Sequence, residues 1–291
     1  RAAVIGGCVG TSNVLAGQMF DIPVKGTHAH SWIMSFKTEL EAFRNYADLY
    51  PDNCLLLVDT YDTLKSGVPH AIQVFNEMKA KGVKLKTYGI RLDSGDLAYL
   101  SKQARRMLDE AGHTDAIISA SSDLDEHLID SLHTQGAKIT SWGVGTNLIT
   151  SKNCPAFGGV YKLAAADEHG NFIPKIKVSE NIEKVTNPGN KTVFRLYDKE
   201  TGKIRADLIA LSDEHYDSQD SLMIFDPIST WKKTLLHGGS YTIRELLVPV
   251  FRDGKCVYQS PAVMDIRDYC ASELNTLWDE SRRLVNPQEV Y

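Results

Sequence analysis

Short apolar runs alternate with helix-like patterns through the first half of the chain. The stretches 22–25, 54–59 and 116–119 are mostly apolar, and each is followed by small or polar residues and then by an amphipathic pattern. Continuous apolar runs of this length are typical of parallel strands buried on both faces. Residues with distinctive chemistry recur at the ends of these runs about thirty residues apart, the length of one strand–helix unit. We therefore predict a series of such units.

The helices of these units are expected over five ranges. They are residues 14–19, 36–50, 69–81, 97–111 and 124–134. The polar residues Thr11, Ser12 and Asn13 can cap the first of them, and Asp93 or Ser94 can cap the fourth, because a side-chain oxygen there accepts from an unpaired backbone N–H.

The alternation of strand and helix stops after Leu163. Strands joined by turns are predicted at residues 175–178, 192–197 and 205–210, with a hairpin around Asp253-Gly254 and a helix over 265–284. The predicted fold class is therefore α/β, in two regions. Residues 1–163 form an irregular, incomplete TIM-like barrel, and residues 164–291 form a smaller, mainly β region that ends in a helix and packs on the barrel.

Composition excludes several classes of partner. The 291 residues are 43% hydrophobic and carry a net charge of −5, so no basic footprint for nucleic acid or an anionic membrane is expected. No apolar run approaches the roughly 18 residues that span a bilayer. The five scattered cysteines form no CxxC pair, which favours reduced thiols and a cytoplasmic protein. Because the chain opens on Arg1 inside a structured motif, we expect a fragment of a longer protein.

His30 lies where the first apolar run gives way to a helix. It could serve in acid–base chemistry, accept a phosphoryl group or position a substrate, and it could also be a structural histidine. His28, two residues before it, suggests a metal-dependent barrel hydrolase as an alternative. That alternative needs further histidines at later strand ends, where the sequence places none.

The later strand ends carry acids, an arginine and serines. Asp59 ends an apolar strand, where a carboxylate needs a partner. Arg91 and Asp93 end the next strand and alternate to one face, with Ser121 after the following one. Arginine offers a planar fork for carboxylate or phosphate, and a nearby carboxylate can hold ribose hydroxyls or Mg²⁺.

Two further stretches are relevant to anion binding. Gly143-Val144-Gly145-Thr146 follows the last strand and presents backbone N–H groups and a hydroxyl, so it is a candidate phosphate loop. It lacks the third glycine of a dinucleotide fingerprint. Lys175, Lys177 and Lys184 form a small basic stripe that we interpret as a solvated face.

With these residues in view, the chain resembles the nicotinate phosphoribosyltransferase family, whose members are type II phosphoribosyltransferases. Five collinear motifs carry the resemblance, and together they are specific although none is so alone. They are Gly-Thr-His-Ala-His-Ser-Trp at 26–32, Leu-Leu-Val-Asp-Thr-Tyr-Asp-Thr at 56–63, Gly-Ile-Arg-Leu-Asp-Ser-Gly-Asp-Leu at 89–97, Gly-Val-Gly-Thr at 143–146 and Pro-Ala-Phe-Gly-Gly-Val-Tyr-Lys-Leu at 155–163.

The resemblance implies an activity and residue roles. The family joins nicotinate to 5-phosphoribosyl pyrophosphate, giving nicotinate mononucleotide and pyrophosphate, with ATP hydrolysis coupled through a phosphohistidine. Carried over by position, the resemblance implies that His30 becomes the phosphohistidine and that Thr27 and Arg91 contact nicotinate. It implies that Asp93 lies near the ribose and the pyrophosphate, and that Asp59 lies near the phosphohistidine and the metal-bound pyrophosphate. The residues implied to bind the phosphate of the phosphoribosyl group are Ser121, Gly143, Gly145 and Thr146.

The resemblance also implies Mg²⁺, ATP as co-substrate and a homodimer with shared sites. Ser12 stands where the related nicotinamide-using enzyme has an acid, so its hydroxyl is expected to favour nicotinate over the amide. The family has further residues before the point matching Arg1, including a tyrosine that stacks on nicotinate. We therefore keep as an alternative that this chain is an inactive fragment that retains phosphate binding.

Overall fold

The computed structural model describes residues 1–180 and 185–290, which divide into two compact units. The sheet unit comprises residues 9–157, and the strand-rich unit comprises residues 1–8 together with those from 158 onward. The first eight residues were expected with the barrel region. They belong to the strand-rich unit because helix α1 (Ala2–Ile5) packs against helix α9 (Val263–Leu274), where Arg267 donates to the carbonyl of Gly7 at 3.2 Å.

The sheet unit is built on four parallel strands in chain order. They are β1 (Asn53–Leu57), β2 (Thr87–Leu92), β3 (Ile117–Ala120) and β4 (Ser141–Trp142). Each strand lies beside the one before it, and a helix connects them, which is the arrangement of a barrel wall. The predicted α/β class is confirmed, and so are the strands predicted from the apolar runs at 54–59 and 116–119.

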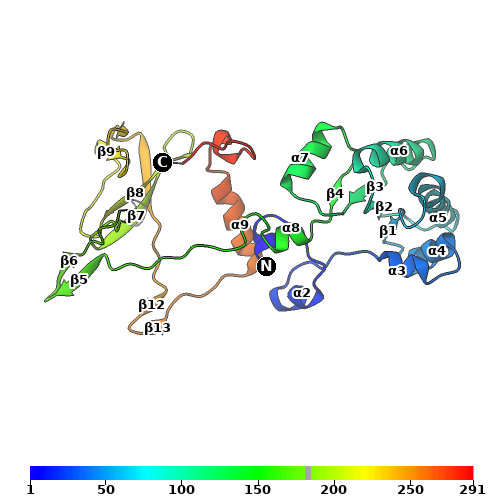
Figure 1. Ribbon diagram of the computed structural model, residues 1–291, viewed down its shortest axis with the longest axis horizontal. Coiled ribbons are helices and arrows are strands. Elements are labelled where there is room, and N and C mark those ends of the chain that lie inside the picture. The colour runs from blue at the N-terminus through cyan, green and yellow to red at the C-terminus, as the bar shows by residue number, and fades with distance from the viewer. Residues whose placement is uncertain (181–184, 291) are drawn as a thin grey trace. The chain divides into compact units, whose positions relative to one another are not determined.

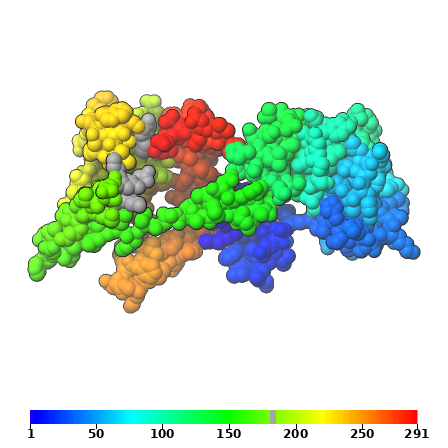
Figure 2. Space-filling model, in the orientation of Figure 1, coloured from blue at the N-terminus to red at the C-terminus, as the bar shows by residue number. Residues whose placement is uncertain are grey.

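Helices cover one face of this sheet. They are α4 (Glu39–Leu49), α5 (Val68–Ala80), α6 (Leu97–Glu110) and α7 (Glu126–Thr134). In Figure 1, α4, α5 and α6 lie along one side of β1–β3, and in Figure 2 the atoms from β1 to α7 form one continuous mass. Leu56, Ile90 and Ile118 are paired across β1–β3 and fully buried in the core between the layers.

The shorter helices of the sheet unit precede the sheet or follow its strands. They are α2 (Val14–Phe20), α3 (His30–Met34), a π-helix η1 (Thr63–Gly67) and α8 (Thr146–Ile149). Of the three predicted caps of α2, Asn13 is the one that caps the helix, because its Oδ1 accepts from the backbone N–H of Ala16 at 2.9 Å. The cap predicted for α6 is wrong, because Asp96 accepts from Tyr99 N–H there. Asp93 and Ser94 make other contacts.

The strand predicted at residues 22–25 is also wrong. The segment forms only an isolated bridge between Val24 and Thr11, since Pro23 has no N–H to give to a ladder. The free edge of β1 is covered instead by His28, whose Nε2 accepts from Leu57 N–H at 3.3 Å. His28 is 8% exposed, and its ring lies 4.3 Å from that of Tyr46.

The strand-rich unit has an antiparallel sheet in the order β11 (Tyr241–Glu245), β7 (Lys191–Asp198), β8 (Ile204–Leu211). Its small core contains Leu196, Leu236 and Tyr241. Three two-stranded hairpins and two further helical segments complete the described part. They are β5 (Ala165–Glu168) with β6 (Asn171–Pro174), β9 (Leu222–Phe225) with β10 (Lys233–Leu236), β12 (Phe251–Arg252) with β13 (Lys255–Cys256), α9, and a 3₁₀ turn η3 (Asp279–Arg282).

Two predictions for this unit need correction. Residues 175–178 are not a strand, and β6 ends at Pro174, which cannot donate to a continuing ladder. The final helix ends at Leu274, not at 284. Within the predicted basic stripe, Lys175 pairs with Glu168 at 3.3 Å, and Lys184 lies outside the described residues.

Gly89 in the middle of β2 is required by close strand packing. A Cβ added there would lie 2.0 Å from the carbonyl oxygen of Ile117 on β3. We expect Gly89→Ala to lower the free energy of unfolding by about 2–4 kcal/mol, because the two strands must move apart in a packed layer. Chemical denaturation measures this. Gly26→Ala is the matched control, since nothing lies within 4 Å of its added Cβ; equal stability of the two variants would contradict the assignment.

His28 should make the sheet unit acid-sensitive. Burial, reinforced by the positive charges of Arg91 and His30, lowers the pKa of His28 from 6.5 to about 4. Between these values the unfolded chain binds the proton and the folded chain does not. Stability is therefore complete above pH 6.5 and is lost as the pH falls toward 4, by roughly 3 kcal/mol.

His28→Gln tests this acid sensitivity, because a Gln oxygen can accept from Leu57 N–H without titrating. Denaturation curves from pH 7 to 4 should show a smaller acid loss in the variant than in the wild type. If wild type and His28→Gln lost the same stability between pH 7 and pH 4, His28 would not be the source of the acid sensitivity.

Candidate active site

The register of the parallel strands brings the predicted polar residues to one edge. Leu57, Arg91 and Ser119 are aligned across β1, β2 and β3. Side chains two residues apart in extended chain point to the same face. Asp59, Asp93 and Ser121 each follow their aligned residue by two positions, so they meet at the carboxyl ends of the strands, where α/β folds place ligands.

His30 joins this edge from the first turn of α3. Its Nδ1 lies 3.0 Å from Thr60 Oγ1, and its Nε2 lies 3.5 Å from Asp93 Oδ2. The ring is therefore fixed at both nitrogens while 38% of the side chain remains exposed to solvent. A fixed and accessible imidazole is suited to accept a group from a bound ligand.

The two carboxylates are connected to each other and to serines. Ser121 donates its hydroxyl to Asp93 Oδ1. Asp59 Oδ2 accepts from the backbone N–H of Asp93 at 2.8 Å and from Ser94 Oγ at 2.7 Å. We call His30, Asp59, Thr60, Asp93 and Ser121 the strand-end cluster. Thr60 and Asp93 are the residues of this cluster that contact His30, and the implied role of Asp59 near the phosphohistidine stays a prediction.

One oxygen of Asp59 remains unused. Asp59 Oδ1 is buried and has no hydrogen-bond partner among the described residues. A buried carboxylate oxygen without a donor is costly unless a ligand or cation completes it. Mg²⁺ takes hard oxygen ligands, with one or two protein carboxylates and the rest from phosphates and water. Asp59 and Asp93 fit that donor set.

Arg91 lies beside the strand-end cluster on the same face. Its Nη1 donates to the hydroxyl of Thr27 and to the carbonyl of His28, the latter at 3.1 Å. Its Nε is buried and has no partner in the part of the chain that the structure describes. The structure therefore brings together Thr27 and Arg91 as predicted, with a guanidinium donor still available.

The loops after β3 and β4 are held close together. Asn147 donates to the carbonyls of Asp123 and Leu124, at 2.8 and 3.2 Å. Ser122 has a φ of 91°, a strained conformation for a residue with a side chain, and such strain concentrates at functional sites. The Gly143 N–H is already used by the carbonyl of Ala120 at 2.7 Å.

Gly143 therefore contributes space rather than a donor, since an added Cβ would lie 3.4 Å from Ser121 Cβ. Gly145 and Thr146 start α8, in the predicted position after β4. Ser12 is exposed in the loop before α2, where neighbouring Thr11 pairs with Val24. Its role in specificity stays a prediction.

Thr60 and Asn147 were given no role from the sequence, and Ser94 was considered only as a helix cap. Thr60 and Ser94 directly follow predicted acids at strand ends, so position alone could have singled them out. Asn147 follows the predicted phosphate loop. Its bond to the preceding loop could not be read from the sequence, because the partners are backbone carbonyls.

The metal alternative built on His28 and His30 does not fit the geometry. His28 is engaged by Leu57 N–H at the β1 edge, whereas His30 faces Thr60 and Asp93. Across residues 1–180 and 185–290, no three His, Cys, Asp or Glu side chains are grouped to hold a metal ion. No helix of these residues is long and apolar enough to cross a bilayer.

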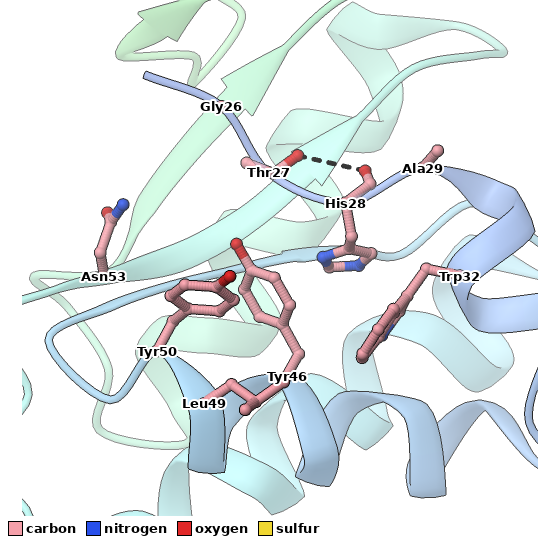
Figure 3. A pocket seen from close by; sticks show the side chains of 9 residues that line it. All are labelled: Gly26, Thr27, His28, Ala29, Trp32, Tyr46, Leu49, Tyr50 and Asn53. Atoms are coloured by element: carbon pink, nitrogen blue, oxygen red, sulfur yellow. Dashed lines mark hydrogen bonds between the residues drawn. The ribbon is translucent and has the colours of Figure 1, made fainter. Parts of the chain in front are cut away.

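A cavity of about 440 Å³ is lined by none of the residues of the strand-end cluster. His28, Trp32, Tyr46 and Tyr50 give it aromatic walls (Figure 3), and Asn53 at the start of β1 closes one side. Asn53 is six residues from Asp59, roughly 20 Å along an extended chain. The cavity therefore borders the segment that carries Thr27 but lies toward the amino end of the sheet.

Two family models match the chain. One, described as the nicotinate phosphoribosyltransferase (NAPRTase) family, matches residues 2–173. The other, described as the nicotinate phosphoribosyltransferase C-terminal domain, matches residues 190–291. The five motifs used in the sequence comparison all lie within the range of the first model.

Curated relatives agree with the models. The chain is 49% identical to the nicotinate phosphoribosyltransferase of Bacillus subtilis over 289 residues, which cover 99% of this chain and 58% of that protein. It is 36% identical to the nicotinate phosphoribosyltransferase of Dictyostelium discoideum, covering 99% of this chain and 56% of that protein. The chain thus spans a little over half the length of these relatives.

Solved structures support the fold. The crystal structure of human nicotinic acid phosphoribosyltransferase matches with a TM-score of 0.76 and 24% identity, covering 99% of this chain and 62% of that one. From the matched family models and the identity to the Bacillus protein, we conclude that the chain belongs to the nicotinate phosphoribosyltransferase family.

Proposed function

We propose that this chain carries the phosphohistidine and phosphoribosyl-transfer site of a nicotinate phosphoribosyltransferase. The reaction would join nicotinate to 5-phosphoribosyl pyrophosphate, release pyrophosphate and hydrolyse ATP. The observation that carries the proposal is His30, held at both ring nitrogens by Thr60 and Asp93 and still open to solvent. Family membership supports nicotinate as the substrate, because the relatives are named nicotinate phosphoribosyltransferase.

The first step would place a phosphoryl group on His30. A ring nitrogen attacks the γ-phosphorus of ATP, the bond to the β-phosphate oxygen breaks, and ADP leaves. The product adds negative charge next to Asp93. Asp59 and Asp93 would hold Mg²⁺, which would supply positive charge against the phosphates and the leaving pyrophosphate.

The second step would be glycosyl transfer. The C1–oxygen bond of 5-phosphoribosyl pyrophosphate breaks as the pyridine nitrogen of nicotinate bonds to C1. Positive charge develops on the ribose, and the Asp93 carboxylate, oriented by Ser121, is placed to stabilise it. Arg91 would hold the nicotinate carboxylate, with the segment 143–146 at the phosphate of the sugar. Subsequent hydrolysis of the phosphohistidine would complete the cycle.

The alternative is a chain that binds phosphate without catalysis. This alternative is kept because the chain spans 58% of the length of the Bacillus relative, so the matched residues are only part of that protein. A homodimer with shared sites and a cytoplasmic location remain part of the proposal for the complete protein.

Transfer of label from ATP tests the proposal. Incubation with γ-labelled ATP and Mg²⁺ should give an acid-labile, base-stable label on the wild-type chain, absent from His30→Ala. His127→Ala, which removes an exposed histidine on α7, should keep the label. Label that persists in His30→Ala would contradict the assignment of His30. An unlabelled wild type would favour the phosphate-binding alternative.

Arg91 should determine affinity for the substrate carboxylate. Arg91→Gln should raise the Kd for nicotinate roughly 10- to 100-fold, since a hydrogen bond to a charged group contributes about 1.5–3 kcal/mol. Calorimetric titration measures this, with nicotinamide as the ligand that lacks the carboxylate. Arg106→Gln on the exposed face of α6 is the matched control. Unchanged nicotinate affinity in Arg91→Gln would exclude this contact.

A further inference from the structure

Glu39 is a buried acid outside the strand-end cluster. It begins α4, is 4% exposed, and accepts two hydrogen bonds at Oε2, from Ser66 Oγ and from His70 Nδ1 at 2.8 Å. A carboxylate at a helix N-terminus is stabilised by the helix dipole. Burying the carboxylate still costs desolvation free energy. If this position served only to pack α4 against its neighbours, an apolar side chain would do so without that cost.

The partners of Glu39 belong to the segment that carries Asp59 and Thr60. Ser66 lies in the π-helix η1 and His70 in the first turns of α5. A Cβ on Gly67 would lie 1.8 Å from the carbonyl oxygen of Val58, so η1 lies directly against the residue before Asp59. Short π-helical segments are frequent at functional sites.

The segment from His30 to Glu39 and the segment from Thr60 to His70 are thus connected at two places. At one end, His30 on α3 contacts Thr60 after β1. At the other, Glu39 on α4 contacts Ser66 and His70. His30 and Glu39 are nine residues apart in the chain, and Thr60 and Ser66 are six residues apart. Movement of η1 relative to α4 would therefore be transmitted to the distance between His30 and Thr60.

We propose that Glu39 is a positioning residue, whose bonds to Ser66 and His70 fix η1 and thereby hold Thr60 against the ring of His30. Its importance for catalysis rests on the proposed function of His30. The geometric part stands independently, because the His30–Thr60 contact exists whether or not the chain transfers phosphate.

Histidine side-chain NMR tests the geometry directly. Long-range ¹H–¹⁵N spectra report the tautomer and hydrogen bonding of each imidazole. The Thr60→Val variant is the reference, because its spectrum shows the His30 signals when the hydrogen bond to the Thr60 hydroxyl is absent. Glu39→Ala and the milder Ser66→Ala should shift the His30 ring signals toward those of Thr60→Val. Glu41→Ala, an exposed acid in the same turn of α4, should leave them unchanged. Glu39→Gln keeps an acceptor for Ser66 and should restore signals close to wild type.

A purely structural role predicts a different pattern. In that case Glu39→Ala and Ser66→Ala would lower the melting temperature and leave the His30 signals in place, and the proposal would be overturned. If wild type accepts label from ATP, Ser66→Ala should also slow labelling, by up to roughly a hundredfold for a displaced reacting group. Failure of wild-type labelling would affect the proposed function only, since the NMR comparison needs no turnover.

Discussion

The alignment of the parallel strands is the constraint on which the candidate site depends. Backbone pairing sets Leu57, Arg91 and Ser119 side by side, and Gly89 permits the close approach of β2 and β3 that this pairing needs. Once this register is fixed, Asp59, Asp93 and Ser121 must emerge together two residues later. A slip of one residue in any strand would turn its acid or serine toward the helices. The chemistry of the edge is therefore determined by hydrogen bonds that involve none of its side chains.

Most of this edge could be predicted from the sequence, because buried parallel strands are continuous apolar runs and their ends are marked by polar residues. Asp59, Arg91, Asp93 and Ser121 were located in this way. The errors arose where tertiary contacts decide. The apolar run at 22–25 resembles a strand, but Pro23 and the lack of a ladder partner leave it a single bridge. The function of His28 could not be foreseen, since its partner is a backbone N–H.

The cluster is polar, and its few unsatisfied atoms lie where ligands are expected. Asp93, Ser121, Thr60 and His30 are connected by two hydrogen bonds, Ser121–Asp93 and His30–Thr60, and by the 3.5 Å contact between His30 Nε2 and Asp93 Oδ2. Of the buried side-chain atoms that lack a hydrogen-bond partner among the described residues, two are at this edge: Asp59 Oδ1 in the strand-end cluster and Arg91 Nε beside it. One is an acceptor suited to a cation and the other a donor suited to an anion. The free acceptor suits Mg²⁺ bound to a phosphate-bearing substrate, and the free donor suits a substrate that carries a carboxylate.

The proposed site requires that ligands and metal meet at the carboxyl ends of β1–β3. The most direct measurement is an anomalous difference map from crystals of the chain grown with Mn²⁺, as a substitute for Mg²⁺, and 5-phosphoribosyl pyrophosphate. If Asp59 holds the metal, a manganese peak will lie within coordination distance of Asp59 Oδ1, with the pyrophosphate bound at the same edge. A peak that lies elsewhere, with the sugar phosphate bound away from Asp59 and Asp93, would contradict it.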